Sequence, residues 1–189
     1  MTFPGGNSML FNTDLMIFIP YVPRADAAAR GYHQWLRDVD APFFNSVPGI
    51  LHYSNWEVKN PPAGHYTHCS FMYLDPALAE GVWTNPDVVA FAAGWTEKWG
   101  IDPGADDMAV NYHSYQLRLT SGQAAFDPSA VRIAASASSV PRFGGAIWEV
   151  AASVVGASPT PFHEFAFGAT AGTAQSDDIL DCTLIDYPT

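Results

Sequence analysis

The chain has 189 residues, of which 48% are apolar and 14% aromatic, so it can build a sizeable hydrophobic core and is not a disordered chain. Its formal net charge is −11, which repels phosphate backbones and anionic lipid and so excludes nucleic acid and the membrane surface as expected partners. The two cysteines, Cys69 and Cys182, lie far apart in strand-like runs, and we expect them to be buried thiols.

The sequence carries no recognisable targeting signal. Residues 1–12 lack the basic region and apolar block of a secretory peptide. The weakly charged stretch 144–167 is interrupted by acidic residues and prolines, so it cannot supply the roughly 20 continuous apolar residues of a spanning helix. We therefore expect a cytoplasmic protein without a membrane segment.

The first half of the chain alternates between strand and helix patterns. Residues 15–22 form a short apolar run that is typical of a buried strand. In residues 25–43, apolar side chains recur every three or four positions, which predicts an amphipathic helix that ends near a proline. Residues 50–58 and 65–74 are rich in β-forming types and are joined by a Pro/Gly-rich turn, so they predict a hairpin.

A second helix and a fourth strand follow the hairpin. Asn85 is a suitable N-cap, Pro86 suits the first helical position, and an apolar stripe continues to Gly100. Residues 108–119 predict a strand. The resulting order, strand–helix–strand–strand–helix–strand, predicts an α+β fold of the ferredoxin-like βαββαβ type.

The last third of the chain has weaker patterns. We expect a helix at 126–139, a helix or an extended segment at 144–155, irregular chain at 157–175 and a strand at 179–187. Its apolar content is too high for a free linker. We therefore expect a ferredoxin-like domain at residues 1–122, and a C-terminal extension at 123–189 that packs on this domain or on a partner subunit.

Hydrogen-bonding aromatic residues are concentrated on the predicted strands. Because strand side chains alternate between faces, one set would contain His52, His68 and Tyr112, and another would contain His113 and Tyr115. Buried polar groups of this kind need hydrogen bonds or a wet cavity, and aromatic walls with a few polar groups are typical of a small-molecule site. Each of these residues has the alternative of a structural role in the core or at an interface.

One carboxylate also stands out, whereas signals for metals and nucleotides are absent. Asp40 lies at the C-terminal end of the first predicted helix, where the helix dipole disfavours a negative charge, so we expect a catalytic or orienting role. His65 and His68 would lie on opposite faces of a strand and could not bind one ion. The sequence has no zinc-spaced cysteines, phosphate-binding loop or dinucleotide motif, which predicts a protein without a metal or cofactor.

One stretch carries a family resemblance. It consists of Asp40-Ala41-Pro42, then Val47-Pro48-Gly49-Ile50, then His52-Tyr53. The stretch resembles the dimeric α+β barrel superfamily and, within it, the EthD-like and REDY-like branches. EthD-type relatives have His-x-Pro at the end of the first helix and a Pro-Gly turn into the second strand, and Asp40 stands where that histidine would be. The resemblance covers residues 14–120.

The resemblance implies a homodimer in which two sheets pair into a closed barrel, with a pocket between each sheet and its helices. It also implies a cofactor-independent lyase, isomerase or cyclase that acts on a small hydrophobic substrate of aromatic or polyketide-like character. His68 would be the general base, Tyr66 or Tyr112 would stabilise a developing oxyanion, and Asp40 or His52 would orient the base or act as the acid.

We expect the substrate to contact Trp35, Tyr53, Trp56, Ser70, His113 and Tyr115. Three alternatives stay open at this point. The protein could be a cofactor-free monooxygenase of the same fold, a haem-binding variant of it, or a binding protein without catalytic activity.

Overall fold

The structure is a computed structural model that describes residues 8–59, 61, 64–100, 112–168 and 179–185. Eight antiparallel strands close a barrel in the order β10-β3-β4-β2-β5-β8-β9-β7. Their bounds are β2 Leu15–Tyr21, β3 Ile50–Lys59, β4 His68–Leu74, β5 Ser114–Ser121, β7 Val131–Ser136, β8 Ala146–Val155, β9 Phe162–Phe167 and β10 Ile179–Leu184. A short ribbon of β1 (Met9–Leu10) and β6 (Ala125–Phe126) lies beside the barrel.

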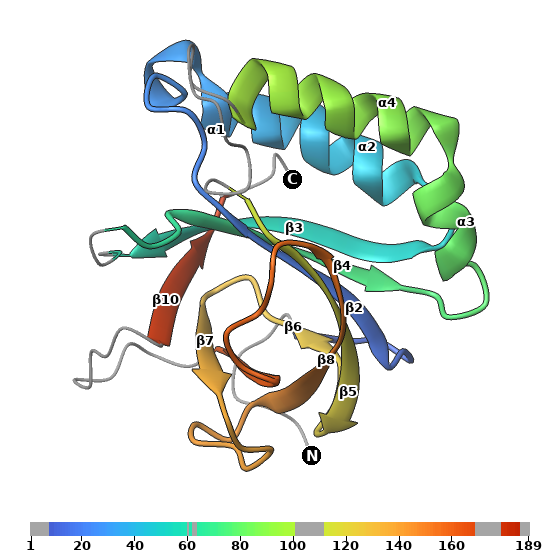
Figure 1. The fold of residues 1–189 in the computed structure, drawn as a ribbon, viewed down its shortest axis with the longest axis vertical. Coiled ribbons are helices and arrows are strands. Elements are labelled where there is room, and N and C mark those ends of the chain that lie inside the picture. The colour runs from blue at the N-terminus through green and yellow to red at the C-terminus, as the bar shows by residue number, and fades with distance from the viewer. Residues whose placement is uncertain (1–7, 60, 62–63, 101–111, 169–178, 186–189) are drawn as a thin grey trace.

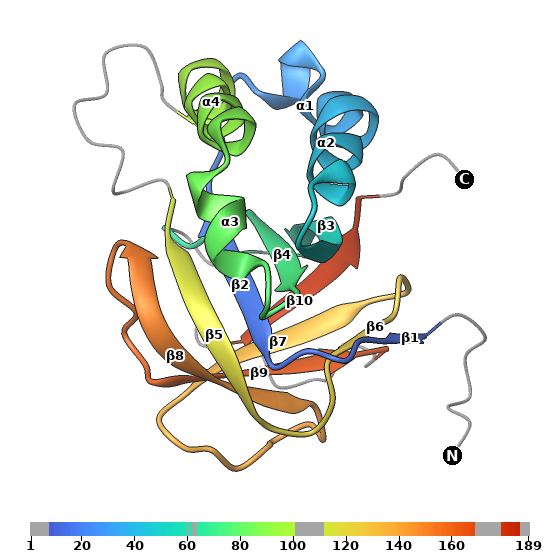
Figure 2. The same ribbon diagram turned by 90° about the vertical axis from the view of Figure 1, so that its right-hand side faces the viewer.

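Two helical arms cover one side of the barrel, above β2, β3 and β4 (Figure 1, Figure 2). The first arm contains a short 3-10 turn, α1, a π-helical turn and α2, at Ala28–Arg30, Tyr32–Trp35, Leu36–Asp40 and Ala41–Ser46. The second contains α3, α4 and another π-helical turn, at Ala79–Thr84, Pro86–Trp95 and Thr96–Gly100. No helix in the described residues is long and apolar enough to cross a membrane.

The π-helical turn of the first arm has a local cause in the sequence. Pro42 has no amide hydrogen, so it cannot make the regular helical bond to the carbonyl of Asp38. The chain is wider there, and the amide of Ala41 bonds instead to the carbonyl of Leu36, five residues earlier. This widened turn ends at Asp40, directly above the sheet.

The central strand β2 is buried on both faces, which explains its continuous apolar sequence. Met16 and Phe18 point into the barrel, where they join a core that also contains Trp56, Phe71 and Trp148. The alternate residues of β2 point toward the helices and pack with side chains of α2, α3 and α4. The barrel and the helix–sheet layer therefore have separate hydrophobic cores that share the same strands.

The Pro-Gly turn before β3 also has a clear structural reason. Gly49 has a φ of 96°, a left-handed conformation that favours glycine. A Cβ atom at this position would lie 2.9 Å from atoms of Leu78 and Val82, next to α3. Glycine therefore allows the turn to pack closely against the second helical arm.

The predicted fold class is wrong, although the predicted order of elements is present in residues 15–121. The four strands of this region do not form an open ferredoxin-like sheet whose second face is covered by another subunit. They form half of a closed barrel, and residues 131–184, expected as an extension, supply the other four strands. β7 and β10 complete the closure by pairing with each other. In this chain its own strands β7 to β10 close the barrel that the predicted homodimer would have closed with a second sheet, and the homodimer itself stays a prediction.

The details of the last third also differ from expectation. The helix expected at 126–139 is instead β7, because Val131 and Ile133 point into the barrel and alternate with residues that face outward. Within the segment 144–155, residues 146–155 are extended as β8, which was one of the two alternatives, and part of the expected irregular segment is β9. The strand expected at 179–187 is confirmed over the residues of β10, and residues 186–187 lie outside the described part.

Candidate functional site

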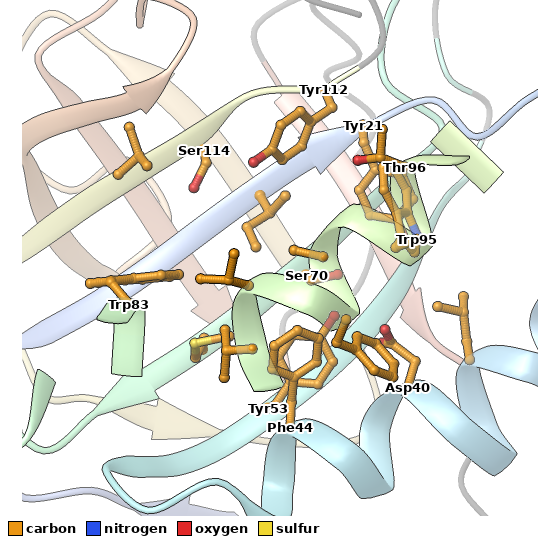
Figure 3. A pocket seen from close by; sticks show the side chains of 18 residues that line it. Tyr21, Asp40, Phe44, Tyr53, Ser70, Trp83, Trp95, Thr96, Tyr112 and Ser114 are labelled. Carbon is orange, nitrogen blue, oxygen red and sulfur yellow. The ribbon is translucent and has the colours of Figure 1, made fainter. Parts of the chain in front are cut away.

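A cavity of about 280 Å³ lies between the two helical arms and the outer face of the barrel. Figure 3 shows its side chains, which come from β2, β3, β4, β5 and β8, from Tyr112 just before β5, and from both helical arms. The cavity is lined by seven aromatic, seven aliphatic and four polar residues: Tyr21, Phe44, Tyr53, Trp83, Phe91, Trp95 and Tyr112; Ile19, Leu36, Met72, Val88, Val89, Ala92 and Val154; Asp40, Ser70, Thr96 and Ser114. A concave apolar site with few polar groups is the usual form of a small-molecule pocket.

Asp40 is the ionisable acid among these residues, and it is only 2% exposed. The π-helical turn places it at the wall of the cavity that faces β3 and β4. Burial raises the pKa of Asp40 to about 7, although hydrogen bonds from Asn55 and Tyr53 act in the opposite direction. Near neutral pH this carboxyl therefore exchanges readily between its acid and base forms.

Asn55, on the same face of β3 as Tyr53, holds the Asp40 carboxyl. Its Nδ2 donates to Oδ2 of Asp40 at 2.8 Å. Its Oδ1 accepts hydrogen bonds from the Tyr53 hydroxyl at 3.1 Å and from Ser70 Oγ at 2.6 Å. Because two hydroxyl donors occupy the amide oxygen, the amide nitrogen is directed at the carboxylate.

A second hydrogen-bonded group supports the part of the cavity wall that contains Tyr21 and Trp95. Trp95 Nε1 donates to the hydroxyl of Tyr32 at 2.9 Å, and that hydroxyl donates to the hydroxyl of Tyr21 at 3.1 Å. Burial raises the pKa of both tyrosines well above the usual value, so both phenols are neutral. These bonds tie β2, the first arm and the second arm together at the site.

Four residues that the sequence predicted for the site line the cavity: Asp40, Tyr53, Ser70 and Tyr112. In Figure 3, Tyr112 and Ser114 lie across the cavity from Asp40 and Tyr53. Burial raises the pKa of Tyr112, which keeps its hydroxyl protonated and able to donate. The structure thus brings together an acid and several hydroxyl groups around an apolar centre.

His68, the predicted general base, lies beside the cavity and does not line it. Its Nε2 is 3.0 Å from Nε2 of His33, and its Nδ1 is 2.9 Å from Oγ1 of Thr67. Burial, with a smaller contribution from the neighbouring His33, lowers the pKa of His68 to about 3. A neutral imidazole with both nitrogens engaged is a weak base, so the geometry favours a structural role.

His52 and Trp56 point into the barrel and away from the cavity. His52 packs against the ring of Phe126, with centroids 4.2 Å apart, and burial lowers its pKa to about 4. The indole of Trp56 donates to Ser54 Oγ at 3.0 Å within the barrel. The set of His52, His68 and Tyr112 is therefore divided between the two faces of the sheet.

The other predicted set lies away from the cavity. His113 Nδ1 is 2.8 Å from the hydroxyl of Tyr66 and 2.5 Å from that of Tyr115. The ring of Tyr115 points into the barrel and stacks on His163, with centroids 5.9 Å apart. Trp35 stacks on the outer side of Phe91 at 5.7 Å, so it supports the cavity wall from behind.

Among the residues of the site that the sequence reasoning did not select are Asn55 and Tyr21. Both lie in strands whose other residues are mostly apolar or aromatic, and Asn55 is fully buried. A buried amide in a strand needs hydrogen-bond partners. The available signal was therefore the position of Asn55 on the face of β3 opposite to His52 and Ser54.

His33 and His68 approach each other at 3.0 Å, but two histidines supply only two ligands for a metal ion. In the described part of the chain, no group of three or more His, Cys, Asp or Glu side chains could hold a metal ion.

Comparison of the chain with models of protein families, with curated proteins and with solved structures finds no match. The superfamily resemblance therefore stays a prediction, and the functional argument depends on the cavity itself.

Proposed function

We propose that the protein is a cofactor-independent acid–base enzyme of the lyase, isomerase or cyclase type, and that its small hydrophobic substrate binds in the cavity above β3 and β4. The observation that carries this proposal is the Asp40 carboxyl, which is buried at the wall of an aromatic cavity and has a pKa of about 7. A general acid or base is most effective when its pKa lies near the working pH.

Asp40 takes the role of proton acceptor and donor in this proposal. The ionised carboxylate removes a proton from carbon in a water-poor site, where its charge is less shielded than in water. Asn55 keeps the carboxyl oriented through its 2.8 Å hydrogen bond. The hydroxyls of Tyr112 and Ser114, across the cavity in Figure 3, stabilise negative charge that develops on a substrate oxygen.

His68 does not take the base role in this proposal, because His33 and Thr67 occupy both of its ring nitrogens. Its ring instead stacks on Tyr21, with centroids 5.5 Å apart, and so supports a residue of the cavity wall. Replacing His68 by Gln should therefore affect stability more than proton transfer.

A planar aromatic probe tests proton abstraction without knowledge of the natural substrate. When a base removes the C3 proton of 5-nitrobenzisoxazole, the C–H and N–O bonds break and a nitrile and a coloured phenolate form. We expect the wild-type rate to increase with pH through about 7, following ionisation of Asp40. We expect Asp40→Asn to lose about 10²-fold or more of this rate.

Asp38 provides the matched control, because it is exposed and lies in the same π-helical turn. Asp38→Asn should keep the wild-type rate. If Asp40→Asn reacts as fast as the wild type while the probe still binds, the cavity is a binding site and the catalytic proposal is wrong.

A further inference from the structure

The charge distribution around the cavity indicates which class of molecule it accepts. None of the described residues that line it is Lys, Arg or His. Among these described residues Asp40 is therefore the single carboxyl or basic group, and besides burial the groups that shift its pKa are Asn55 and Tyr53, both neutral. An anionic ligand would be repelled by this acid and would find no positive partner among these side chains.

A buried carboxylate normally has a cationic partner in the protein. The buried guanidinium of Arg132 on β7 has such an ionic partner, the partly exposed Asp181 on β10, whereas the buried carboxylate of Glu164 accepts three backbone N–H groups instead. Among the ion pairs of the described residues, none includes Asp40. Its ionised form therefore has hydrogen-bond donors, but in the described part of the chain it is not paired with a positive charge.

We propose that the cavity binds a hydrophobic amine in its protonated form, and that the ammonium group of this ligand is the counter-ion of Asp40. The inference rests on the proposed function, because it assigns a substrate class to the same carboxyl.

The aromatic walls fit this class of ligand. Phe44 and Tyr53 lie beside Asp40 in Figure 3, with ring centroids 4.6 Å apart. The faces of aromatic rings attract ammonium groups, most strongly where water is excluded. Tyr21, Trp83 and Trp95 extend the aromatic lining and would contact the apolar part of the ligand. The net charge of −11 also raises the local concentration of cations around the protein.

Three probes of the same shape separate charge from hydrophobic contact: 2-naphthylmethylamine, 2-naphthylmethanol and 2-naphthoate. Their binding to the full chain can be measured by isothermal titration calorimetry at pH 8, where Asp40 is mostly ionised and the amine is mostly protonated. We expect the amine to bind the wild type about tenfold or more tightly than the alcohol. We expect 2-naphthoate to bind more weakly than both.

Asp40→Asn should bind the amine and the alcohol equally, whereas Asp38→Asn should keep the preference of the wild type. Binding of the alcohol to Asp40→Asn shows that the cavity is intact. If that variant does not fold, the comparison of the three probes in the wild type still decides the question. Equal binding of amine and alcohol by the wild type, or an amine preference that survives Asp40→Asn, overturns the inference.

The 5-nitrobenzisoxazole reaction distinguishes this failure from failure of the proposed function. If the wild type shows no amine preference but still requires Asp40 for the reaction, only the substrate class is wrong. If the amine binds through Asp40 and the reaction does not depend on it, the cavity is a cation-binding site and the proposed function is wrong.

Discussion

Asp40→Asn should change the pH dependence of stability by an amount that follows from the burial of this residue. The pKa of Asp40 is raised from 3.8 to about 7 in the folded protein. Between these values the folded state binds a proton that the unfolded state has released, so this group stabilises the fold at low pH and loses that contribution as the pH rises through 7. The full difference corresponds to about 4 kcal/mol.

An asparagine at position 40 has nearly the same shape and does not titrate. The unfolding free energy of Asp40→Asn, relative to that of the wild type, should therefore increase by about 4 kcal/mol between pH 4 and pH 8. Because this prediction concerns a difference between two pH values, a constant effect of the substitution on packing does not alter it.

Urea unfolding at pH 4, 5, 6, 7 and 8 measures the free energies, provided that the slopes of the two proteins agree. Asp38→Asn again provides the control, because its exposed carboxyl is in water in both the folded and the unfolded states. A stability difference between Asp40→Asn and the wild type that stays constant across this pH range would refute the reasoning. It would mean that the carboxyl is hydrated in the folded protein.

Three further predictions concern the barrel. His163 has a buried Nδ1 without a hydrogen-bond partner, and burial lowers its pKa to about 4. The unfolding free energy of His163→Phe should therefore increase by about 3 kcal/mol relative to that of the wild type as the pH falls from 7 to 4, which the same unfolding series measures. Arg132 forms a bidentate ion pair with Asp181, at 2.7 and 3.0 Å, across the strands β7 and β10 that close the barrel. Asp181→Asn should therefore lower the free energy of unfolding in urea by about 2 kcal/mol, and an unchanged midpoint would contradict this. The sulfur atoms of Cys69 and Cys182 lie 3.9 Å apart, but β3 lies between the strands that carry them. Their Cα atoms are therefore about two strand spacings apart, which is too far for a disulfide, so mass spectrometry after mild oxidation should find both thiols free.

The sequence predicted the local elements of the first half well because their signals are local. The apolar run of β2, the Asn85 cap of α4 and the Pro-Gly turn before β3 each depend on neighbouring residues only. Closure of the barrel depends on contacts between distant segments, such as the pairing of β7 with β10. The Ala- and Ser-rich sequence of residues 126–139 favoured a helix in isolation, but burial of Val131 and Ile133 in the barrel outweighs that propensity.

Asp40 could be predicted as a candidate site residue because the helix dipole disfavours a carboxylate at the C-terminal end of a helix. Its partners could not be predicted, because they depend on strand register. Asn55 pairs with Ser70 and His52 pairs with Tyr73, so the two pairs lie on opposite faces of the sheet. Alternation within each strand was read correctly, but it does not say which residues of β3 share a face with those of β4.

The location of the site follows from the way in which the barrel is filled. Rings of Trp56, Phe71 and Trp148 pack in its interior, so the strands present their functional groups to the helical layer instead. Both helical arms contain a π-helical turn at this level, and residues of both turns line the cavity: Leu36 and Asp40 from the first, and Thr96 from the second. A wider turn shifts the helix surface relative to the sheet and prevents close packing along the whole length of the arm. The same local irregularity that opens space for a ligand therefore also places the carboxyl at its wall.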